Sequence, residues 1–573
     1  MITQADAATY DAVWLLDVEI DGRTYRYTSA ASAQQVTTDT GLSYLYAAGM
    51  SDLRLTSANE SAAVQIIDGT DWAALFSAGA SMEGGRATLR RWWYGLTHEQ
   101  AHVWAAGVAK GAEYGELGEP FIFTVEAAAS ADTDPILPAG SLALKPLHFG
   151  PDRTGGPTYD VYTEALGLPL PLGIGYPGDM GNDTSRAVVP AILTDWTTSS
   201  TPSDLDTCRC SVSIGRVDAT TVYVEERDQF PNGPTYTATI AYGTKDSNTG
   251  EVANTFDVSY FDFSGTDSEG AAARSIVPGT GSDSKAHYLA GFKPSTGGGI
   301  ANPYATGTLS GAGDVIIWAL RRSGGSLLVD YDNLEEMRDL LNEYRIDLWI
   351  NDVEIRALEW LRSNILSILP VVETSTVNGW ALSHIDWEAS EADALGTLTA
   401  DRDIFRASSA RVINAGDLVS HVTVTYRPSD AAHTPFGGYL AQVSLTPDLY
   451  LKADTSALGF QDSPSYPDRI ARISHARHGL RKTEIQIDQT WEDATALRVA
   501  RDVLKAQGLA ILGVTYQAAT DTLERARVGD VWLLTDAGMG WTERIAIVTE
   551  IIVAGNEPPA LTFALPDPLL KRA

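Results

Sequence analysis

The sequence predicts a mainly β fold with α+β elements. Short segments of alternating apolar and polar residues, separated by turn residues, run through most of the chain. Helical spacing is confined to a short stretch near the N-terminus, a group of segments in the middle and one long segment near the C-terminus. At 573 residues the chain exceeds one ordinary core and should divide into about three or four domains. We therefore expect two similar β domains, each with a packed helix, flanking a β-rich and a small α/β module.

Residues 1–128 form the first expected β domain. Alternating segments flank Asp21-Gly22, a pair that favours a two-residue hairpin turn. The hydroxyl of Thr70 is expected to cap a short helix in TDWAALF. RATLRRWWYGL predicts a strand, and two more strands separated by a glycine-rich turn are expected in VWAAGVAKGAEYGELGEPFIFTVEA.

Residues 129–310 are expected to form a middle domain rich in β-hairpins, because turn-forming residues dominate between short strands. Hairpins are predicted between CRCSVSIGRV and TTVYVEE, and between TYTATIAYG and NTFDVSYFDF. Residues 264–311 are rich in Gly, Ser, Thr and Asp, which predicts a polar loop with little regular structure of its own.

Residues 311–388 predict a small α/β module. GDVIIWALRRSG is expected to be a helix ended by glycine, and the segment from Asp332 has acidic residues early and apolar residues at helical spacing. VEIRALEWLRSNILSILP predicts a third helix that ends before Pro370. Asn378-Gly379 predicts the turn of a hairpin.

Residues 389–573 return to the pattern of the first domain. RVINAGDLVSHVTVTYRP predicts a strand pair, and Thr490 is expected to begin the helix ATALRVARDVLKAQG, with Gly508 as its stop. ILGVTYQ, DVWLLTD, RIAIVTEIIVAG and ALTFAL predict strands. A sheet with one packed helix at each end of the chain predicts a duplicated fold.

The charge is the unusual feature of the composition. Asp and Glu number 74 against 41 Lys and Arg, a net charge of −33. Such a surface repels nucleic-acid phosphates, and it is typical either of simple solubility or of a surface that DNA passes without adhering. No run of about 18 apolar residues is present, which predicts no transmembrane helix. The N-terminus, MITQADAATYDAVW, lacks the basic and apolar regions of a secretory signal.

The cysteine count excludes two kinds of cross-linked fold. Cys208 and Cys210 lie two residues apart in a predicted strand and should face the same way. A structural zinc or iron–sulfur site needs about four such ligands, and the chain has no other cysteine. A fold held by disulfides is excluded as well, so two thiols on a strand face are expected.

The order of segments at the C-terminal end resembles a known family. The helix ATALRVARDVLKAQG, the strand ILGVTYQ and then ERARVGDVWLLTDAGMGWTERIAIVTEI follow the order found in the last domain of baseplate hub proteins of long-tailed bacteriophages, also called tail tip proteins. GGRATLRRWW with WAAGVAKG looks like the first domain of that family. GDVIIWALRRSG, VEIRALEWLRSNILSILP and NGW look like its middle region. The resemblance covers about half of the chain, and it lies in the order of the parts.

The resemblance implies a structural role in a virion. Hub proteins of this kind form a homotrimer at the tail tip, in which the first and last domains resemble tail-tube subunits, so that three chains supply six tube-like domains. That ring continues the tail tube, closes its channel and links the distal tail protein ring and the tape measure protein to tail fibres or a spike. DNA passes through the channel without specific binding, and an acidic lumen fits such passage. Assembly in the host cytoplasm and only indirect contact with the host envelope are also implied.

Two features of some longer relatives are not expected here. A cysteine-ligated iron–sulfur cluster needs more than two cysteines, and the chain stops at LPDPLLKRA, directly after the second tube-like domain, which predicts no appended enzyme.

The stretch THEQAH contains H-E-x-x-H, the pattern of a zinc peptidase. His98 and His102 would have to lie one turn apart on a helix as ligands, with Glu99 as the general base and a third ligand downstream. The candidates for that third ligand are Glu113, Glu116, Glu119 and Glu126. The glycines that follow make a poor helix, and a loop joining two antiparallel strands explains all six residues. The sequence therefore favours a hairpin connection over zinc.

Other candidate sites have simple structural explanations. Glu225-Glu226 resembles a glycosidase pair only by adjacency, because neighbouring strand residues face opposite sides. Arg90-Arg91-Trp92-Trp93-Tyr94 mixes cations and aromatics as some nucleic-acid sites do, yet strand alternation sends the two tryptophans to opposite faces. We expect one of them in the core and the other at a subunit interface.

The leading hypothesis is a non-enzymatic structural protein, with no catalytic, cofactor or metal site, that acts as the hub of a phage tail tip. Residues 264–311 are expected to face attached fibres or a spike. The alternative is a zinc metallopeptidase or cell-wall hydrolase built on His98, Glu99 and His102. A third class, an isolated carbohydrate-binding or adhesion β protein, explains the strands and aromatics, but it does not explain two similar domains at opposite ends of the chain.

Overall fold

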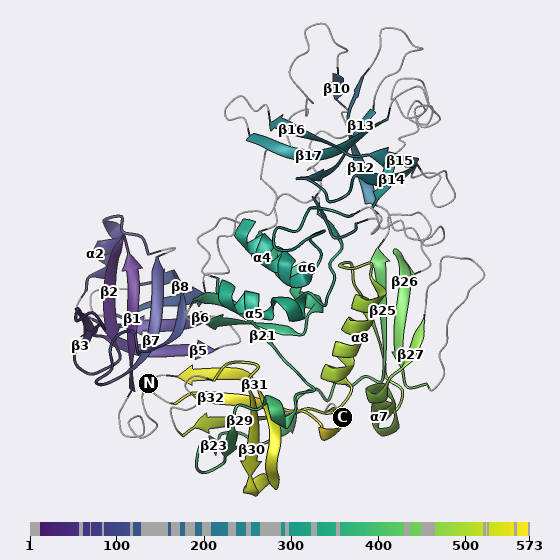
Figure 1. Cartoon of the computed structure of the whole chain (residues 1–573). Helices are drawn as coiled ribbons and strands as arrows, with labels where there is room; N and C mark the ends of the chain where they lie inside the picture. Colours follow the sequence, from purple (N-terminus) through teal and green to yellow (C-terminus); the bar gives the residue numbers. More distant parts are fainter. Residues whose placement is uncertain are drawn as a thin grey trace.

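Figure 1 shows the computed structural model of the chain, which is mainly β with α+β elements, as the sequence predicts. The structure describes residues 12–56, 61–68, 70–82, 85–114, 119–127, 159–161, 172–177, 189–197, 208–226, 236–247, 254–263, 288–292, 297–322, 329–350, 356–376, 378–428, 436–448, 464–519, 523, 526–554 and 558–570. No helix within these ranges has the length and apolar character needed to cross a membrane.

The N-terminal part is a curved sheet that packs around large apolar side chains. Its elements are β1 (Ala12–Ile20), β2 (Arg23–Thr28), β3 (Gln34–Thr37), β4 (Ser43–Ala48), β5 (Met50–Thr56), β6 (Ser61–Ile66), α2 (Trp72–Ser77), β7 (Arg86–Trp93), β8 (His102–Glu113) and β9 (Phe121–Ala127). The strands lie in the order β5-β6-β9-β8-β7-β1-β2-β4-β3. Alternation along β1 turns Trp14, Leu16 and Val18 into the main core and turns Asp17 to the opposite face.

Two local predictions for this part can be compared directly with the structure. The turn at Asp21-Gly22 is confirmed, since both residues have positive φ, of 50° and 72°, and β1 pairs with β2 around them. The predicted cap at Thr70 is wrong. Asp71 caps α2 by accepting a hydrogen bond from the backbone N–H of Ala74 at 2.9 Å, while the Thr70 hydroxyl donates to Asp68.

Strands from the C-terminal part extend the same sheet. They are β22 (Thr397–Thr399), β23 (Ile404–Arg406), β24 (Arg411–Val412), β29 (Leu512–Ala518), β30 (Val531–Asp536), β31 (Trp541–Ala554) and β32 (Ala560–Leu565), and the last four confirm the predicted strands. The end of β31 pairs antiparallel with β5, with Ile552 opposite Thr56. Buried side chains of both parts, including Trp14 and Phe563, belong to one contiguous core cluster. Figure 1 shows this junction between the purple and yellow strands.

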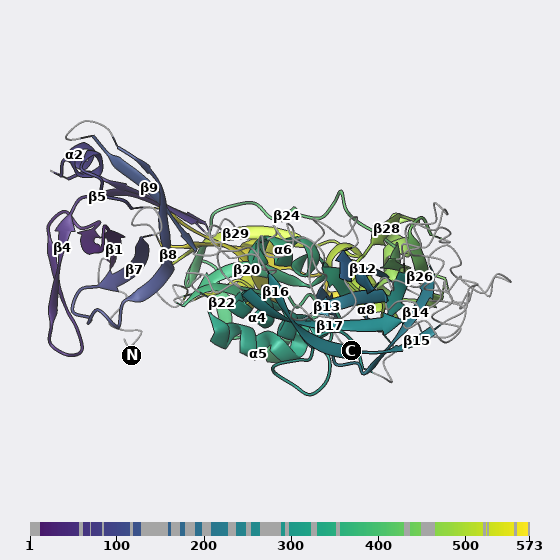
Figure 2. The ribbon, with the colours of Figure 1, turned by 90° about the horizontal axis from the view of Figure 1, so that it is seen from above.

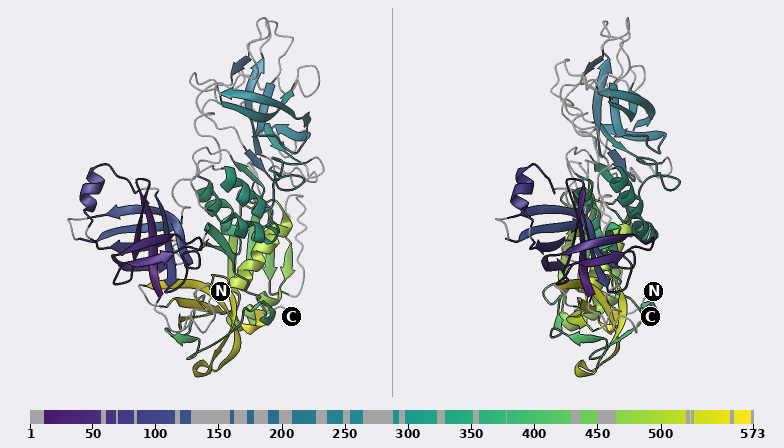
Figure 3. Two further views of the ribbon diagram at one scale, coloured as in Figure 1. Left: turned by 60° about the vertical axis from the view of Figure 1, so that its left-hand side comes forward. Right: turned by 90° about the vertical axis from the view of Figure 1, so that its left-hand side faces the viewer.

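A second sheet lies at the far end of the molecule. It consists of β10 (Tyr159–Val161), β12 (Val189–Thr197), β13 (Cys208–Ile214), β14 (Thr221–Glu226), β15 (Tyr236–Thr239), β16 (Ala241–Ser247), β17 (Asn254–Phe263) and β18 (Tyr288–Gly291). Its order is β15-β14-β18-β12-β13-β17-β16, with β10 beside β12. Figures 2 and 3 show this sheet set apart from the N-terminal strands.

Several predictions for this second sheet need correction. The hairpin predicted between CRCSVSIGRV and TTVYVEE is wrong, because β13 pairs with β12 and β17 whereas β14 pairs with β15 and β18. The other predicted hairpin is confirmed only for β16 with β17. The segment 264–311 is also more ordered than expected, since β18 lies inside it and between two other strands. Its residues 264–287 and 293–296 lie outside the described ranges.

Helices and two short sheets fill the space between these parts. The module predicted for 311–388 contains α4 (Ala312–Arg322), α5 (Tyr331–Leu341), β19 (Leu348–Ile350), α6 (Ala357–Asn364), β20 (Val371–Thr376) and β21 (Gly379–His384), and β19 pairs with β11 (Leu172–Ile174). The predicted helices are confirmed at α4 and α5, and the hairpin at Asn378-Gly379 is confirmed by β20 and β21. The third helix is shorter than predicted, since α6 ends at Asn364 and a 3₁₀ turn, Leu366–Ile368, follows.

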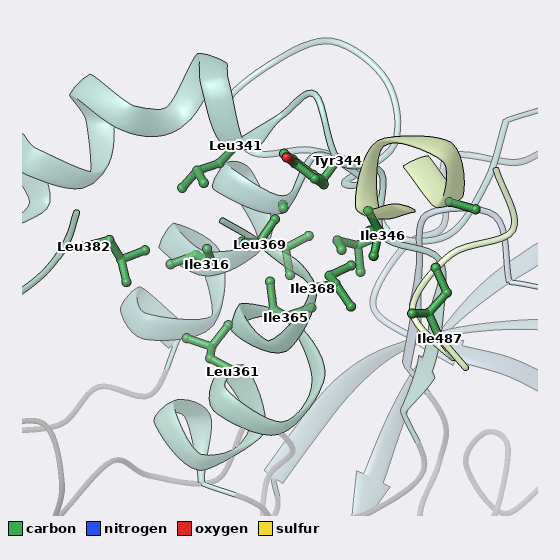
Figure 4. Close-up of a cluster of buried hydrophobic side chains, with 14 of the residues drawn as sticks. Ile316, Leu341, Tyr344, Ile346, Leu361, Ile365, Ile368, Leu369, Leu382 and Ile487 are labelled. Atoms are coloured by element: carbon green, nitrogen blue, oxygen red, sulfur yellow. The ribbon is translucent and has the colours of Figure 1, made fainter. Parts of the chain in front are cut away.

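A four-stranded sheet completes the second core. It contains β25 (His421–Pro428), β26 (Tyr439–Thr446), β27 (Ser465–Pro467) and β28 (Lys482–Gln486), with α7 (Arg469–His478) and α8 (Asp493–Gln507). Side chains of α4, α6, β25, β26 and α8 share one buried cluster, part of which Figure 4 shows around Ile316, Leu361 and Ile365. Short 3₁₀ turns elsewhere are Glu391–Asp393, Ala537–Met539 and Pro568–Leu570.

The long C-terminal helix differs from its prediction in its start and its packing. α8 begins at Asp493 after Glu492, without a side-chain cap, so the predicted start at Thr490 is wrong. It packs on β25 and β26 and not on the sheet that joins the N-terminal strands. Gly508 ends α8 as predicted, but its φ is negative. A Cβ there would lie 2.5 Å from Ile470 of α7, so close packing of the two helices requires glycine. The strand pair predicted in RVINAGDLVSHVTVTYRP is also wrong, because β24 pairs with β29 and β25 pairs with β26 and β28.

Candidate functional site

The THEQAH stretch lies in the connection between two antiparallel strands. Residues from Thr97 to Ala101 form turns, and His102 is the first residue of β8, which pairs with β7. The connection between strands that the sequence favoured is therefore confirmed. The helix that a zinc peptidase needs is not formed, because the residues of the motif lie partly in a turn and partly in a strand.

The three residues of the motif point to different partners. The backbone N–H of His98 donates to the carbonyl of Thr37 at 2.9 Å, and Glu99 Oε2 accepts from the backbone N–H of Asp39 at 2.8 Å. The His102 ring packs edge-on against Trp104, with 5.4 Å between ring centroids. The loop is thus fastened to the β3–β4 hairpin, which explains its polar residues without a metal.

The proposed third ligands do not complete a metal site either. Glu113 lies opposite Ile122 at the end of β8, and Glu126 lies opposite Val108 in β9. Glu119 precedes β9, and Glu116 lies outside the described residues. Within the ranges that the structure describes, no three His, Cys, Asp or Glu side chains are grouped so that they could hold a metal ion. The zinc-peptidase alternative has no geometric support.

His98 instead belongs to a charged cluster around Asp17 on the outer face of the sheet. Its Nε2 lies 3.6 Å from Asp17 Oδ2, Arg26 Nε lies 2.9 Å from Asp17 Oδ1, and Arg90 also contacts the carboxylate. The Tyr46 hydroxyl donates to Asp17 Oδ1 at 3.0 Å. Burial opposes ionisation of Asp17, but His98, Arg90, Tyr46 and Arg26 together hold its pKa below the usual value.

This cluster holds the β3–β4 hairpin across the outer face of β1. A small apolar cluster beside it contains Leu15, Val36, Tyr46, Trp92 and other buried side chains. The pocket above Asp17 has a volume of about 260 Å³ and includes Arg26, Arg90 and His98. Sequence reasoning missed Asp17, although its position in VWLLDVEI, as a charge inside an apolar strand, marks a polar partner on that face. Its four contacts, with Arg26, Arg90, His98 and Tyr46, explain this carboxylate by a structural role in holding the hairpin on the sheet.

The aromatic stretch before THEQAH is buried within the chain itself. Trp92 and Trp93 are 4% and 6% exposed, so the prediction that one of them is left for a subunit interface is wrong. Trp92 donates its indole N–H to the carbonyl of Leu96 at 2.9 Å, and the buried Arg91 guanidinium lies 5.0 Å from the Trp14 ring. Tyr94 is exposed and packs edge-on against Trp92.

The remaining candidate residues lie in the second sheet. Cys208 lies opposite Trp196 and Phe263, and Cys210 lies opposite Leu193 and Phe261, so the strand predicted for both is confirmed. Glu225 and Glu226 are adjacent residues of β14, opposite Leu289 and Tyr288 of β18. The side chains of these four residues lie outside what the structure describes.

The free edges of the long sheet are the candidate assembly surface. The sheet runs from β23 at one edge, through the β31–β5 junction, to β3 at the other edge. Apolar side chains are exposed close to both edges: Leu45 on β4 is 68% exposed and Phe405 on β23 is 52% exposed. Unpaired strand edges with exposed apolar side chains are sites where another chain can add. Among the described residues, β3 and β23 end the main path of the sheet, with β22 beside β30 off this path, and both end strands can bind neighbours.

Comparisons with known proteins give only distant similarities. No protein-family profile matches the chain, and no curated protein matches it. Among solved structures, it is similar to a prophage MuSo2 43 kDa tail protein from Shewanella oneidensis, with a TM-score of 0.37 and 10% identity over 97% of this chain and 100% of that chain.

Two further structures are similar at the same level. A tail protein from Neisseria meningitidis MC58 has a TM-score of 0.34 and 8% identity over 97% of both chains. A chain from the virion of a native gene transfer agent particle has a TM-score of 0.36 and 9% identity over 75% of this chain and 89% of that chain.

Proposed function

We propose that the chain is a structural virion protein, the homotrimeric hub at the tail tip of a long-tailed phage or a related particle. The observation that carries this proposal is the pairing of β5 with β31, which makes one sheet from the two ends of the chain, with β3 and β23 as the end strands of its main path among the described residues. The proposal also rests on the family resemblance in the order of the sequence segments. In this proposal residues 1–128 and 389–573 supply the tube-like domains, and 129–310 and 311–388 are modules between them.

A closed trimer uses both open edges of the long sheet. The β3 edge of one copy meets the β23 edge of the next copy, so that three chains form a ring without a free edge. Heterologous contacts of this kind give a ring when the rotation closes. Leu45 and Phe405, which are exposed in the single chain, become covered in the ring. The ring continues the tail tube, closes its channel before infection and opens for DNA ejection.

The partners follow from this position in a virion. The ring contacts the distal tail protein and the tape measure protein on one side and fibres or a spike on the other. The net charge of −33 supports passage of DNA without adhesion, because acidic walls repel phosphates. The protein acts by assembly and has no catalytic step in this proposal.

Native mass spectrometry of the purified chain tests the oligomeric state. A closed trimer has three times the chain mass of 61.4 kDa, about 184 kDa. Measurement over a series of protein concentrations separates a defined trimer from nonspecific association, which adds copies without a limit. A chain that stays at 61.4 kDa throughout the series contradicts the homotrimer.

A further inference from the structure

A pocket lined by two tryptophans lies between the start of β31, at Gly540 and Trp541, and the segment Pro566–Pro568 that follows β32. Its volume is about 430 Å³, within the range of small-molecule sites. Trp387 and Trp541 supply aromatic surface, Arg544 supplies N–H donors, and Glu391 and Glu543 supply carboxylate acceptors. Both indole rings pack against the main core on one side, so they are held in place before any ligand binds.

A β-bulge creates this arrangement. In the β30–β31 pair, Trp541 lies opposite Asp536 and Arg544 lies opposite Leu534, so two residues of β31 face the single residue Thr535. Residues three apart in a regular strand point to opposite faces, but the extra residue brings Trp541 and Arg544 to the same side. The Arg544 Cζ atom accordingly lies 5.5 Å from the centroid of the Trp541 ring.

The backbone at the bulge is held in a conformation that is uncommon for side chains. Glu543 has a φ of 47°, and its N–H donates to the Thr535 hydroxyl at 3.1 Å. Non-glycine residues with positive φ persist only where the surroundings fix them, and such strain occurs often at binding sites. Glu543 is one of the residues that line the pocket beside Trp541 and Arg544.

Arg544 is the second unusual feature of the pocket. Its Nε is buried and has no hydrogen-bond acceptor among the residues that the structure describes. The nearby carboxylate of Asp567 is bound by Arg477, with 2.6 Å between Nη1 and Oδ2, and it makes no ion pair with Arg544 within the described ranges. A buried donor without an acceptor costs free energy.

We propose that this pocket binds a neutral saccharide. The faces of sugar rings stack on indoles, and sugar hydroxyls both accept hydrogen bonds from Arg544 and donate them to Glu391 and Glu543. Three carboxylates line the pocket, those of Glu391, Glu543 and Asp567, so an anionic ligand meets repulsion, and a cationic ligand brings no acceptor for the Arg544 guanidinium. A neutral polyhydroxylated ring satisfies all of these groups. The site does not depend on trimer formation, so its failure would leave the proposed hub function untouched.

Binding can be tested on the full chain with defined neutral oligosaccharides. Maltotriose, cellotriose, chitotriose and mannotriose are titrated up to about 10 mM, followed by saturation-transfer NMR and by tryptophan fluorescence. At least one of these sugars is expected to bind, with saturation transferred to the protons of its ring face. The absence of binding by all four sugars overturns the proposal. So does binding of only the charged probes, citrate or tetramethylammonium.

Variants locate the site. Trp541→Ala is expected to weaken the binding of that sugar about tenfold or more, because it removes one stacking face. Arg544→Gln is a second variant that keeps the aromatic walls and is also expected to weaken binding. Trp104→Ala, which removes a half-buried tryptophan packed on the same core far along the chain, is the matched control and is expected to bind normally. Melting curves show that each variant is folded. Unchanged affinity in folded Arg544→Gln or Trp541→Ala places the sugar elsewhere and overturns the proposal.

Discussion

Replacement of Phe405 by Asp is the most direct perturbation of the proposed assembly surface. Phe405 is 52% exposed in the single chain and lies on β23, at one free edge of the long sheet. About half of its side chain is already covered in the single chain, so the substitution also costs the monomer about 0.8–1.5 kcal/mol. In the trimer it is covered by the β3 edge of the next copy, where an ionised carboxylate would be desolvated without a partner.

The size of the effect can be worked out from the exposed fraction. Burial of a whole Phe side chain stabilises by about 1.5–3 kcal/mol. Because about half of the Phe405 side chain remains to be covered, each contact gains about 0.8–1.5 kcal/mol, and three equivalent contacts in a ring gain about 2.5–4.5 kcal/mol. The association constant of the trimer should therefore fall by about 10²–10³, and desolvation of the carboxylate adds to this loss.

Sedimentation equilibrium and native mass spectrometry measure this change. Leu45→Asp, on β4 beside the opposite end strand β3, should weaken the trimer in the same way. Leu480→Asp is the matched control, since Leu480 is 56% exposed and lies outside the long sheet, and this variant should form the wild-type trimer. Far-UV circular dichroism verifies that the variants are folded. A trimer of wild-type strength in both edge variants would refute the assignment of these edges to the interface.

Three further results are expected. Trp72→Ala should lower the free energy of unfolding, measured by urea denaturation, by about 3–5 kcal/mol, because it removes the ring stacked 4.3 Å from Phe121. Trp72→Phe keeps an aromatic ring and should cost less, so an equal loss in the two variants would contradict this reasoning. Burial raises the pKa of Asp536, but hydrogen bonds from Tyr516 and Arg406 outweigh this effect and hold the pKa below the usual value of an aspartate. The ionised carboxylate therefore stabilises the fold at neutral pH, and this stabilisation is lost as the pH falls through the lowered pKa of the folded state. The difference in urea midpoint between wild type and Asp536→Asn should therefore shrink in acid, and a constant difference would argue against this. Glu99→Ala should speed hydrogen exchange at Asp39 by loosening the β3–β4 hairpin, with a cost of about 0.5–1.5 kcal/mol, whereas Glu99→Gln keeps an acceptor and should exchange like wild type.

Local features of the fold could be predicted from the sequence, because their causes lie within a few residues. The Asp21-Gly22 turn follows from the φ values that its strand pair needs, and α8 follows from apolar residues at helical spacing. The connection at THEQAH could be predicted as well, since its flanking residues favour strands and not a long helix.

Pairing between distant strands could not be predicted in the same way. β13 and β14 are adjacent in the sequence and have good strand patterns, yet each pairs with other strands, because the sheet is ordered by contacts that no local pattern records. For the same reason, the packing of α8 on β25 and β26 could not be predicted from the sequence. The saccharide pocket was missed because its residues come from separate segments, and because the bulge that brings Trp541 and Arg544 together has no clear signature in the sequence.

The junction of β5 with β31 also constrains how the chain is made. About 500 residues separate the two strands, and synthesis at about 5–20 residues per second leaves the β5 edge without its partner for roughly 25–100 s. During that interval the nascent chain carries an open edge on which other chains can aggregate. If the N-terminal strands fold during synthesis, this edge stays open to other chains until β31 has been made. A chain truncated before β31 keeps that exposed edge permanently.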